Sequence, residues 1–102
     1  MATLRSLEEI KKKEDELRKK LKMASSNSER QKIANKLEGV CTVRHILASP
    51  SYKNKEYSIN YEIKKVEEQM KDWEDYTGEK SDNHRAMLAG LKYAFKRNRR
   101  KK

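Results

Sequence analysis

Apolar residues recur every three or four positions along most of this chain, and this spacing limits the fold to packed helices. Between residues 7 and 21, the positions on this spacing carry Leu7, Ile10, Glu14, Leu17 and Leu21, with one charged interruption. An α-helix brings residues three and four apart onto one face, whereas a strand requires strict alternation. No alternating stretch longer than a few residues occurs, so the sequence predicts an all-α fold without a sheet.

Four helices are expected, at about residues 4–23, 29–48, 59–77 and 82–96. Thr3 and Ser6 are N-cap candidates for the first, and Ser6 followed by Glu9 fits a capping box. Pro50 stops the second helix, and Gly78 ends the third. These four helices predict a small helical hairpin or bundle over residues 1–95, followed by a basic C-terminal tail at 96–102.

The predicted core is thin. Leu, Ile, Val and Phe make up only 17 of 102 residues, and 41% of the chain is charged, a composition otherwise typical of disorder. The narrow apolar stripes are typical of coiled-coil seams. We therefore expect an elongated bundle that is stabilised by its own packing, by a second copy or by a partner. The most regular apolar stripe comprises Ile59, Ile63, Val66, Met70 and Trp73. We expect this seam to pack on one of the first two helices or on a second copy of the chain.

Several classes of protein do not fit this sequence. No apolar run approaches the roughly 20 residues of a membrane span, and residues 1–23 lack the apolar segment of a secretory signal. The single cysteine, Cys41, fits a reducing intracellular compartment, cytoplasmic or nuclear. With three glycines there is no phosphate-binding loop, and no paired-carboxylate or nucleophile motif occurs. We expect neither enzymatic activity nor a cofactor.

Charge is the strongest functional signal. The net charge is +10, of which residues 82–102 carry +7, whereas residues 59–81 carry −3. Such a basic segment attracts the phosphates of nucleic acids. The acidic 59–81 helix is expected to pair with the basic helices; the alternative is that it repels nucleic acid from one side of the protein. Predicted phosphate contacts at the C-terminal end are Arg85, Lys92, Lys96, Arg97, Arg99, Arg100, Lys101 and Lys102.

Two further surfaces are candidates for nucleic-acid contact. One is a set of lysines on the first helix: Lys11, Lys12, Lys13, Lys19 and Lys20. The other is the arm at residues 52–57, where Tyr52, Lys53 and Lys55 precede Tyr57 and Tyr61. Interleaved aromatic and cationic residues stack bases and hold phosphates in single-strand binders. They also close helix ends against a core, and both interpretations stay open.

Two short motifs have competing interpretations. Residues 31–47 resemble a DNA-reading helix-turn-helix, but the segment after Gly39 is about two residues short, which favours one continuous helix. Cys41 and His45 lie one helical turn apart, as in a thiolate–imidazole pair, and His84 would add a third metal ligand. Packing is the favoured role for all three, so no metal is predicted.

The sequence thus predicts a non-enzymatic accessory protein that binds nucleic acid through backbone phosphates with weak sequence preference. Helix 82–96 and the tail would be the main contact. Whether the ligand is DNA or RNA, single or double stranded, stays open. The alternative is a helical interaction module, an adaptor or inhibitor, that docks on a protein partner or joins a homo-oligomer or larger complex. Neither hypothesis requires a membrane.

Overall fold

The computed structural model describes residues 2–97, and the all-α expectation is confirmed. Four helices form the fold: α1 (Leu7–Met23), α2 (Asn27–Ala48), α3 (Lys55–Thr77) and α4 (Asp82–Lys92). Two three-residue strands, β1 (Ala2–Leu4) and β2 (Phe95–Arg97), flank them. Met1 and residues 98–102, which include most of the predicted tail, lie outside the described residues.

Local capping fixes where the helices begin and end. The capping box at Ser6 is confirmed: the Ser6 hydroxyl accepts from the Glu9 amide at 3.2 Å, and the Glu9 carboxylate accepts from the Ser6 amide at 3.0 Å. Helix α1 therefore begins at residue 7 rather than 4. Helix α3 begins four residues earlier than predicted because Asn54 caps it. Gly78 ends α3 as predicted, with a left-handed φ of 75°.

The prediction of no sheet is wrong. Strands β1 and β2 pair antiparallel, with Thr3 opposite Lys96 and Leu4 opposite Phe95. Helix α4 consequently ends at Lys92 instead of residue 96, and the first two residues of the predicted tail belong to β2. The Arg5 guanidinium donates to the Tyr93 carbonyl at 2.6 Å and lies 4.0 Å from the Tyr93 ring centroid. The two ends of the described chain are thereby joined.

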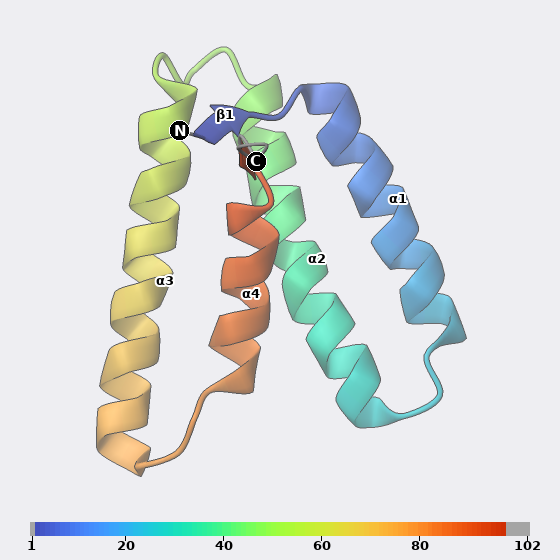
Figure 1. Ribbon diagram of the computed structural model, residues 1–102, viewed down its shortest axis with the longest axis vertical. Helices are drawn as coiled ribbons and strands as arrows, with labels where there is room; N and C mark the ends of the chain where they lie inside the picture. The colour runs from blue at the N-terminus through green and yellow to red at the C-terminus, as the bar shows by residue number, and fades with distance from the viewer. Residues whose placement is uncertain (1, 98–102) are drawn as a thin grey trace, which may run out of the picture.

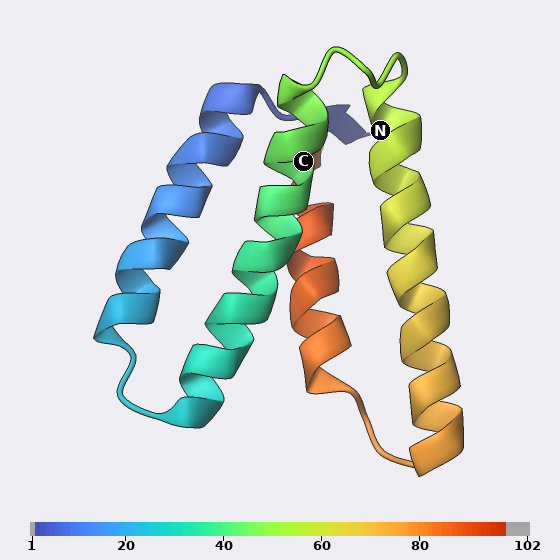
Figure 2. The ribbon, with the colours of Figure 1, turned by 180° about the vertical axis from the view of Figure 1, so that it is seen from behind.

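Helices α1 and α3 form the two outer edges of the molecule, and α2 and α4 lie between them (Figure 1). The view from behind shows the same order (Figure 2). Helix α2 packs on both α1 and α4, and α4 packs on α3. The molecule measures 40 × 36 × 33 Å, so the expectation of an elongated, coiled-coil-like bundle is wrong.

Helices α2 and α4 cross at two glycines. A Cβ atom on Gly90 would lie 2.1 Å from the Lys36 carbonyl oxygen, and one on Gly39 would lie 2.4 Å from the Met87 carbonyl oxygen. Neither distance leaves room for a side chain. Helix α2 runs without interruption through Gly39, so residues 31–47 are not a helix-turn-helix. Gly39 instead lies where the α4 backbone packs directly against α2.

The seam on α3 is buried for most of its length. Ile59, Ile63 and Val66 are at most 9% exposed and belong to the single core cluster. The main partner of α3 is α4, which was not expected, and α3 also contacts α2, as expected. Trp73, predicted as core, is 41% exposed. It lies at the far end of the seam, beside residues 80–81 and the first turn of α4.

Candidate nucleic-acid interface

A cationic groove lies where the second half of α1, the first half of α2 and the start of α4 meet. Its volume is about 390 Å³. Four of its eight lining residues are cations and only one is an acid. The lining residues are Leu17, Lys20, Lys32, Ile33, Lys36, Asp82, Arg85 and Ala86. We call this surface the α1–α2–α4 groove.

The lysines of the α1–α2–α4 groove lack counter-charges. Among residues 2–97, Lys20, Lys32 and Lys36 form no ion pair. Burial, followed by the like charges of Lys13 and Lys20, lowers the pKa of the Lys36 ammonium below its usual value. An anion placed in the groove would relieve this repulsion.

Packing holds this charge in place. The Lys36 carbonyl lies at the α2–α4 crossing, against Gly90, so the backbone that carries Lys36 has little freedom. Lys13 extends over the Tyr93 ring, with its ammonium 5.1 Å from the ring centroid. Ile33 and Leu17 supply apolar lining to the same groove. The arrangement presents several ammonium groups to one ligand, which suits a run of phosphates better than a single small anion.

Three of the predicted cations, Arg85, Lys92 and Lys96, form ion pairs. Arg85 lies 3.2 Å from Glu74, and Lys92 lies 3.4 Å from Glu67, both carboxylates of α3. The expected pairing of the acidic helix with basic helices is therefore observed. Lys96 lies 3.2 Å from Glu9. Each of these cations would have to leave a carboxylate to hold a phosphate.

The remaining predicted residues of the C-terminal end are described in part or not at all. Arg97 pairs through its backbone with Ala2 in the small sheet. Arg99, Arg100, Lys101 and Lys102 lie outside the described residues. Of the predicted contacts, the structure brings Arg85 from the C-terminal set and Lys20 from the first-helix set into the α1–α2–α4 groove.

The 52–57 arm partly closes the connection between α2 and α3. The Tyr52 ring packs edge-on against His45, with centroids 6.5 Å apart. The Lys55 ammonium donates to the Ser49 carbonyl across the loop. Lys53 is exposed. Tyr52 and Lys55 thus take the helix-closing role, and Lys53 remains accessible.

Cys41 pairs with a carboxylate instead of with His45. Its thiol donates to Glu14 at 3.3 Å, and Glu14 also lies 2.7 Å from Arg18 and 2.6 Å from Arg44. Burial raises the pKa of the Cys41 thiol, and the Glu14 contact raises it further. A thiol held in its neutral form is a poor nucleophile. Within residues 2–97 no group of three or more potential metal ligands occurs.

The buried Glu14 explains the charged interruption in the first stripe. Burial alone would raise its pKa, but the hydrogen bonds from Arg18 and Cys41 and the charge of Arg44 outweigh it, so the pKa falls below the usual 4.5. We expect Glu14→Gln to lower the free energy of unfolding at pH 7 by about 1–2 kcal/mol, because two arginines lose their partner.

This loss should depend on pH. A carboxylate with a lowered folded-state pKa contributes stability above its usual pKa of 4.5 and loses it as the pH falls through the lower value. The wild-type and Glu14→Gln denaturation midpoints should therefore converge below pH 4.5. Asp15→Asn, an exposed neighbour, is the matched control. An equal loss in both variants, or a constant difference down to acid pH, would contradict the buried ion cluster.

Sequence reasoning missed Lys32 and Lys36, although a signal was present. The α1–α2 connection contains only residues 24–26, and a short connection makes neighbouring helices antiparallel. Positions at similar distances from the turn then lie on neighbouring parts of the two helices, which sets Lys20 near Lys32 and Lys36, and Lys13 near Lys36. The lysines of α1 and the lysines of α2 are separate in the sequence, and they form one surface only when the two helices pack together.

Comparison with protein-family models, with curated proteins and with solved structures gave no match. Over the described part of the chain, no helix has both the length and the apolar character needed to cross a membrane.

Proposed function

We propose that this protein is a non-enzymatic accessory protein that binds nucleic acid through backbone phosphates. The main contact is the α1–α2–α4 groove rather than helix α4 and the tail alone. The observation that supports this choice is the set of ammonium groups on Lys20, Lys32 and Lys36, which form no ion pair with any residue from 2 to 97. When such ammonium groups neutralise phosphates, the counterions condensed on the nucleic acid are released, and this release favours binding.

The proposal predicts affinity that falls steeply with salt and depends little on base sequence, because ammonium groups contact phosphates without reading bases. The basic segment 98–102 adds a second contact through Arg99, Arg100, Lys101 and Lys102. Arg85 would join the groove after exchanging Glu74 for a phosphate. Lys53 lies beyond α2 and serves as an additional contact.

The experiment is a binding titration of duplex and single-stranded oligonucleotides at several salt concentrations, with the full chain and with a chain ending at residue 97. The truncation removes four cations, lowering the net charge from +10 to +6, and it leaves β2 in place. We expect the slope of log K against log salt to fall by up to about 3.6 on duplex or about 2.8 on a single strand. The truncated chain should still bind, through the groove. A full chain that fails to bind at low salt would refute the proposed function.

A second candidate function rests on the acidic half of α3. Tyr76 is 91% exposed and Trp73 41% exposed, and Asp72, Asp75 and Glu79 are exposed beside them. Exposed aromatic residues are enriched in protein interfaces. This surface suits docking on a basic protein partner, so absence of nucleic-acid binding would favour the adaptor hypothesis.

A further inference from the structure

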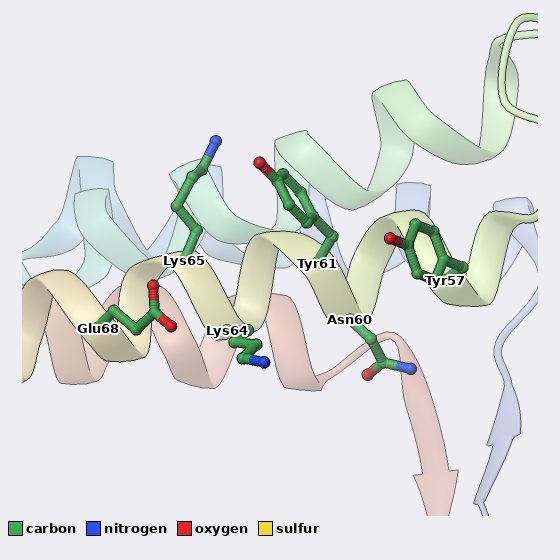
Figure 3. Close-up of a pocket in the computed structure, with 6 residues that line it drawn as sticks. All are labelled: Tyr57, Asn60, Tyr61, Lys64, Lys65 and Glu68. Atoms are coloured by element: carbon green, nitrogen blue, oxygen red, sulfur yellow. The ribbon is translucent and has the colours of Figure 1, made fainter.

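Helix α3 carries two exposed tyrosines on successive turns of its outward face. Tyr57 is 68% exposed and Tyr61 is 56% exposed. They line a shallow hollow of about 460 Å³ together with Asn60, Lys64, Lys65 and Glu68. Figure 3 shows all six side chains emerging from α3, with Tyr57 and Tyr61 one turn apart. We call Tyr57, Asn60, Tyr61, Lys64 and Lys65 the tyrosine face.

Core packing does not account for the tyrosine face. The apolar seam of α3, at Ile59, Ile63 and Val66, is buried on the opposite side of the helix. Neither Tyr57 nor Tyr61 belongs to the core cluster or packs against it. Two large aromatic rings therefore remain largely in water, where their burial by a ligand would be favourable.

The polar groups around the rings indicate the chemistry of that ligand. The Lys65 ammonium lies 5.6 Å from the Tyr61 ring centroid and 3.2 Å from Glu62. Lys64 is exposed and, among residues 2–97, forms no ion pair. Asn60 offers an amide that both donates and accepts. Aromatic rings beside the Lys64 ammonium, the paired Lys65 ammonium and one amide suit stacked bases with phosphates alongside.

We propose that the tyrosine face binds unpaired nucleobases by stacking, so that the preferred ligand is single-stranded nucleic acid. This inference rests on the proposed nucleic-acid-binding function and narrows its ligand class. Tyr57 and Tyr61 each stack one base, and Lys64 holds an adjacent phosphate. Bases paired inside a duplex do not expose the faces that such stacking needs.

The charge along α3 sets the length of the site. Beyond Lys65 the same face continues as Glu68, Asp72 and Asp75, all exposed. Like charge repels phosphates from this half, so the strand contacts only the first three turns of the face. The tyrosine face and the α1–α2–α4 groove lie on different helices (Figure 1), which allows each to be altered without the other.

The test compares two single strands of equal length and equal phosphate number. One is oligothymidylate, and the other carries abasic sugar–phosphate units at its central positions. We expect the wild-type chain to bind the base-bearing strand about tenfold or more tightly than the abasic strand, since each stacked base contributes about five- to 150-fold. Tyr57→Ala combined with Tyr61→Ala should bind both strands equally, at the abasic level.

Two controls separate stacking from other effects. Tyr57→Phe with Tyr61→Phe keeps both rings and should keep the preference for bases. Tyr76→Ala removes a tyrosine that is even more exposed than Tyr57 and Tyr61. It lies on the acidic half of α3, and this variant should also keep the preference for bases. Circular dichroism should show the same helix content in all variants, because the replaced side chains are exposed.

The outcomes distinguish this inference from the proposed function. If the wild-type chain binds both strands equally, the protein contacts phosphates and the tyrosine face does not stack bases. The inference is also overturned if the double alanine variant keeps its preference for bases. If neither strand binds at low salt, both the inference and the proposed function are wrong.

Discussion

Gly90→Ala is expected to lower the free energy of unfolding by about 3 kcal/mol. The new Cβ atom would lie 2.1 Å from the Lys36 carbonyl oxygen, so α2 and α4 would have to separate. Overpacking a tight interior costs typically 1–3 kcal/mol and occasionally more, whereas the intrinsic helix preference of alanine over glycine recovers only about 1 kcal/mol. The loss is large for a domain whose whole stability is about 5–15 kcal/mol. Urea denaturation followed by circular dichroism measures it.

A matched pair of variants tests whether the cause is the helix crossing. Gly39→Ala should cost a similar amount, because its Cβ atom would meet the Met87 carbonyl oxygen at 2.4 Å. Gly78→Ala is the contrasting control: no atom lies within 4 Å of its Cβ position, and only its φ of 75° is unfavourable, which costs about 1–2 kcal/mol. If Gly90→Ala proves more stable than Gly78→Ala, the two helices do not approach as closely as described.

The helices were predictable from the sequence because local rules determine them. The spacing of Ile59, Ile63 and Val66 predicts a buried helix face, and Gly78 predicts its end. Local rules do not tell which positions of a stripe a neighbouring element will cover. Trp73 continues the same stripe but lies where α4 begins, and it is 41% exposed.

The small sheet was unpredictable for a different reason. A strand of three residues, Ala2–Leu4 or Phe95–Arg97, is too short to show alternation. Each forms only because the other lies beside it, from the far end of the described chain. This pairing also places Lys96 against Glu9, so a cation that the sequence assigns to a free tail lies in an ion pair.

The class of ligand was predictable from the sequence, but the location of the candidate site was not. A high positive net charge indicates a phosphate ligand without indicating which cations bind it. Which cations are free depends on the carboxylates that the fold brings beside them. Glu67 and Glu74 approach Lys92 and Arg85 across the α3–α4 interface. No carboxylate of the described chain pairs with Lys32 or Lys36.

Replacing Lys32 and Lys36 together with glutamine should weaken nucleic-acid binding about 60-fold at 0.1 M salt. Each phosphate contact contributes a slope of about 0.9 on duplex, which is a factor of about eight at 0.1 M relative to 1 M salt, and two contacts multiply. The slope itself should fall by about 1.8 on duplex or about 1.4 on a single strand. Folding should be unimpaired or slightly improved, because Lys36 loses an unfavourable interaction with Lys13 and Lys20.

The control for this double variant is Lys11→Gln with Lys12→Gln, which removes the same net charge from exposed positions of α1 outside the groove. If the groove holds phosphates, the control should lose only a small part of the affinity, and its salt slope should stay near that of the wild-type chain. Equal losses in both double variants would mean that binding follows net charge alone, and the groove would then have no special role.

Because Lys36 is carried by the backbone at the α2–α4 crossing, a destabilised Gly39→Ala chain that remains folded should also bind more weakly. That coupling between a packing contact and affinity is expected only if the groove is the site.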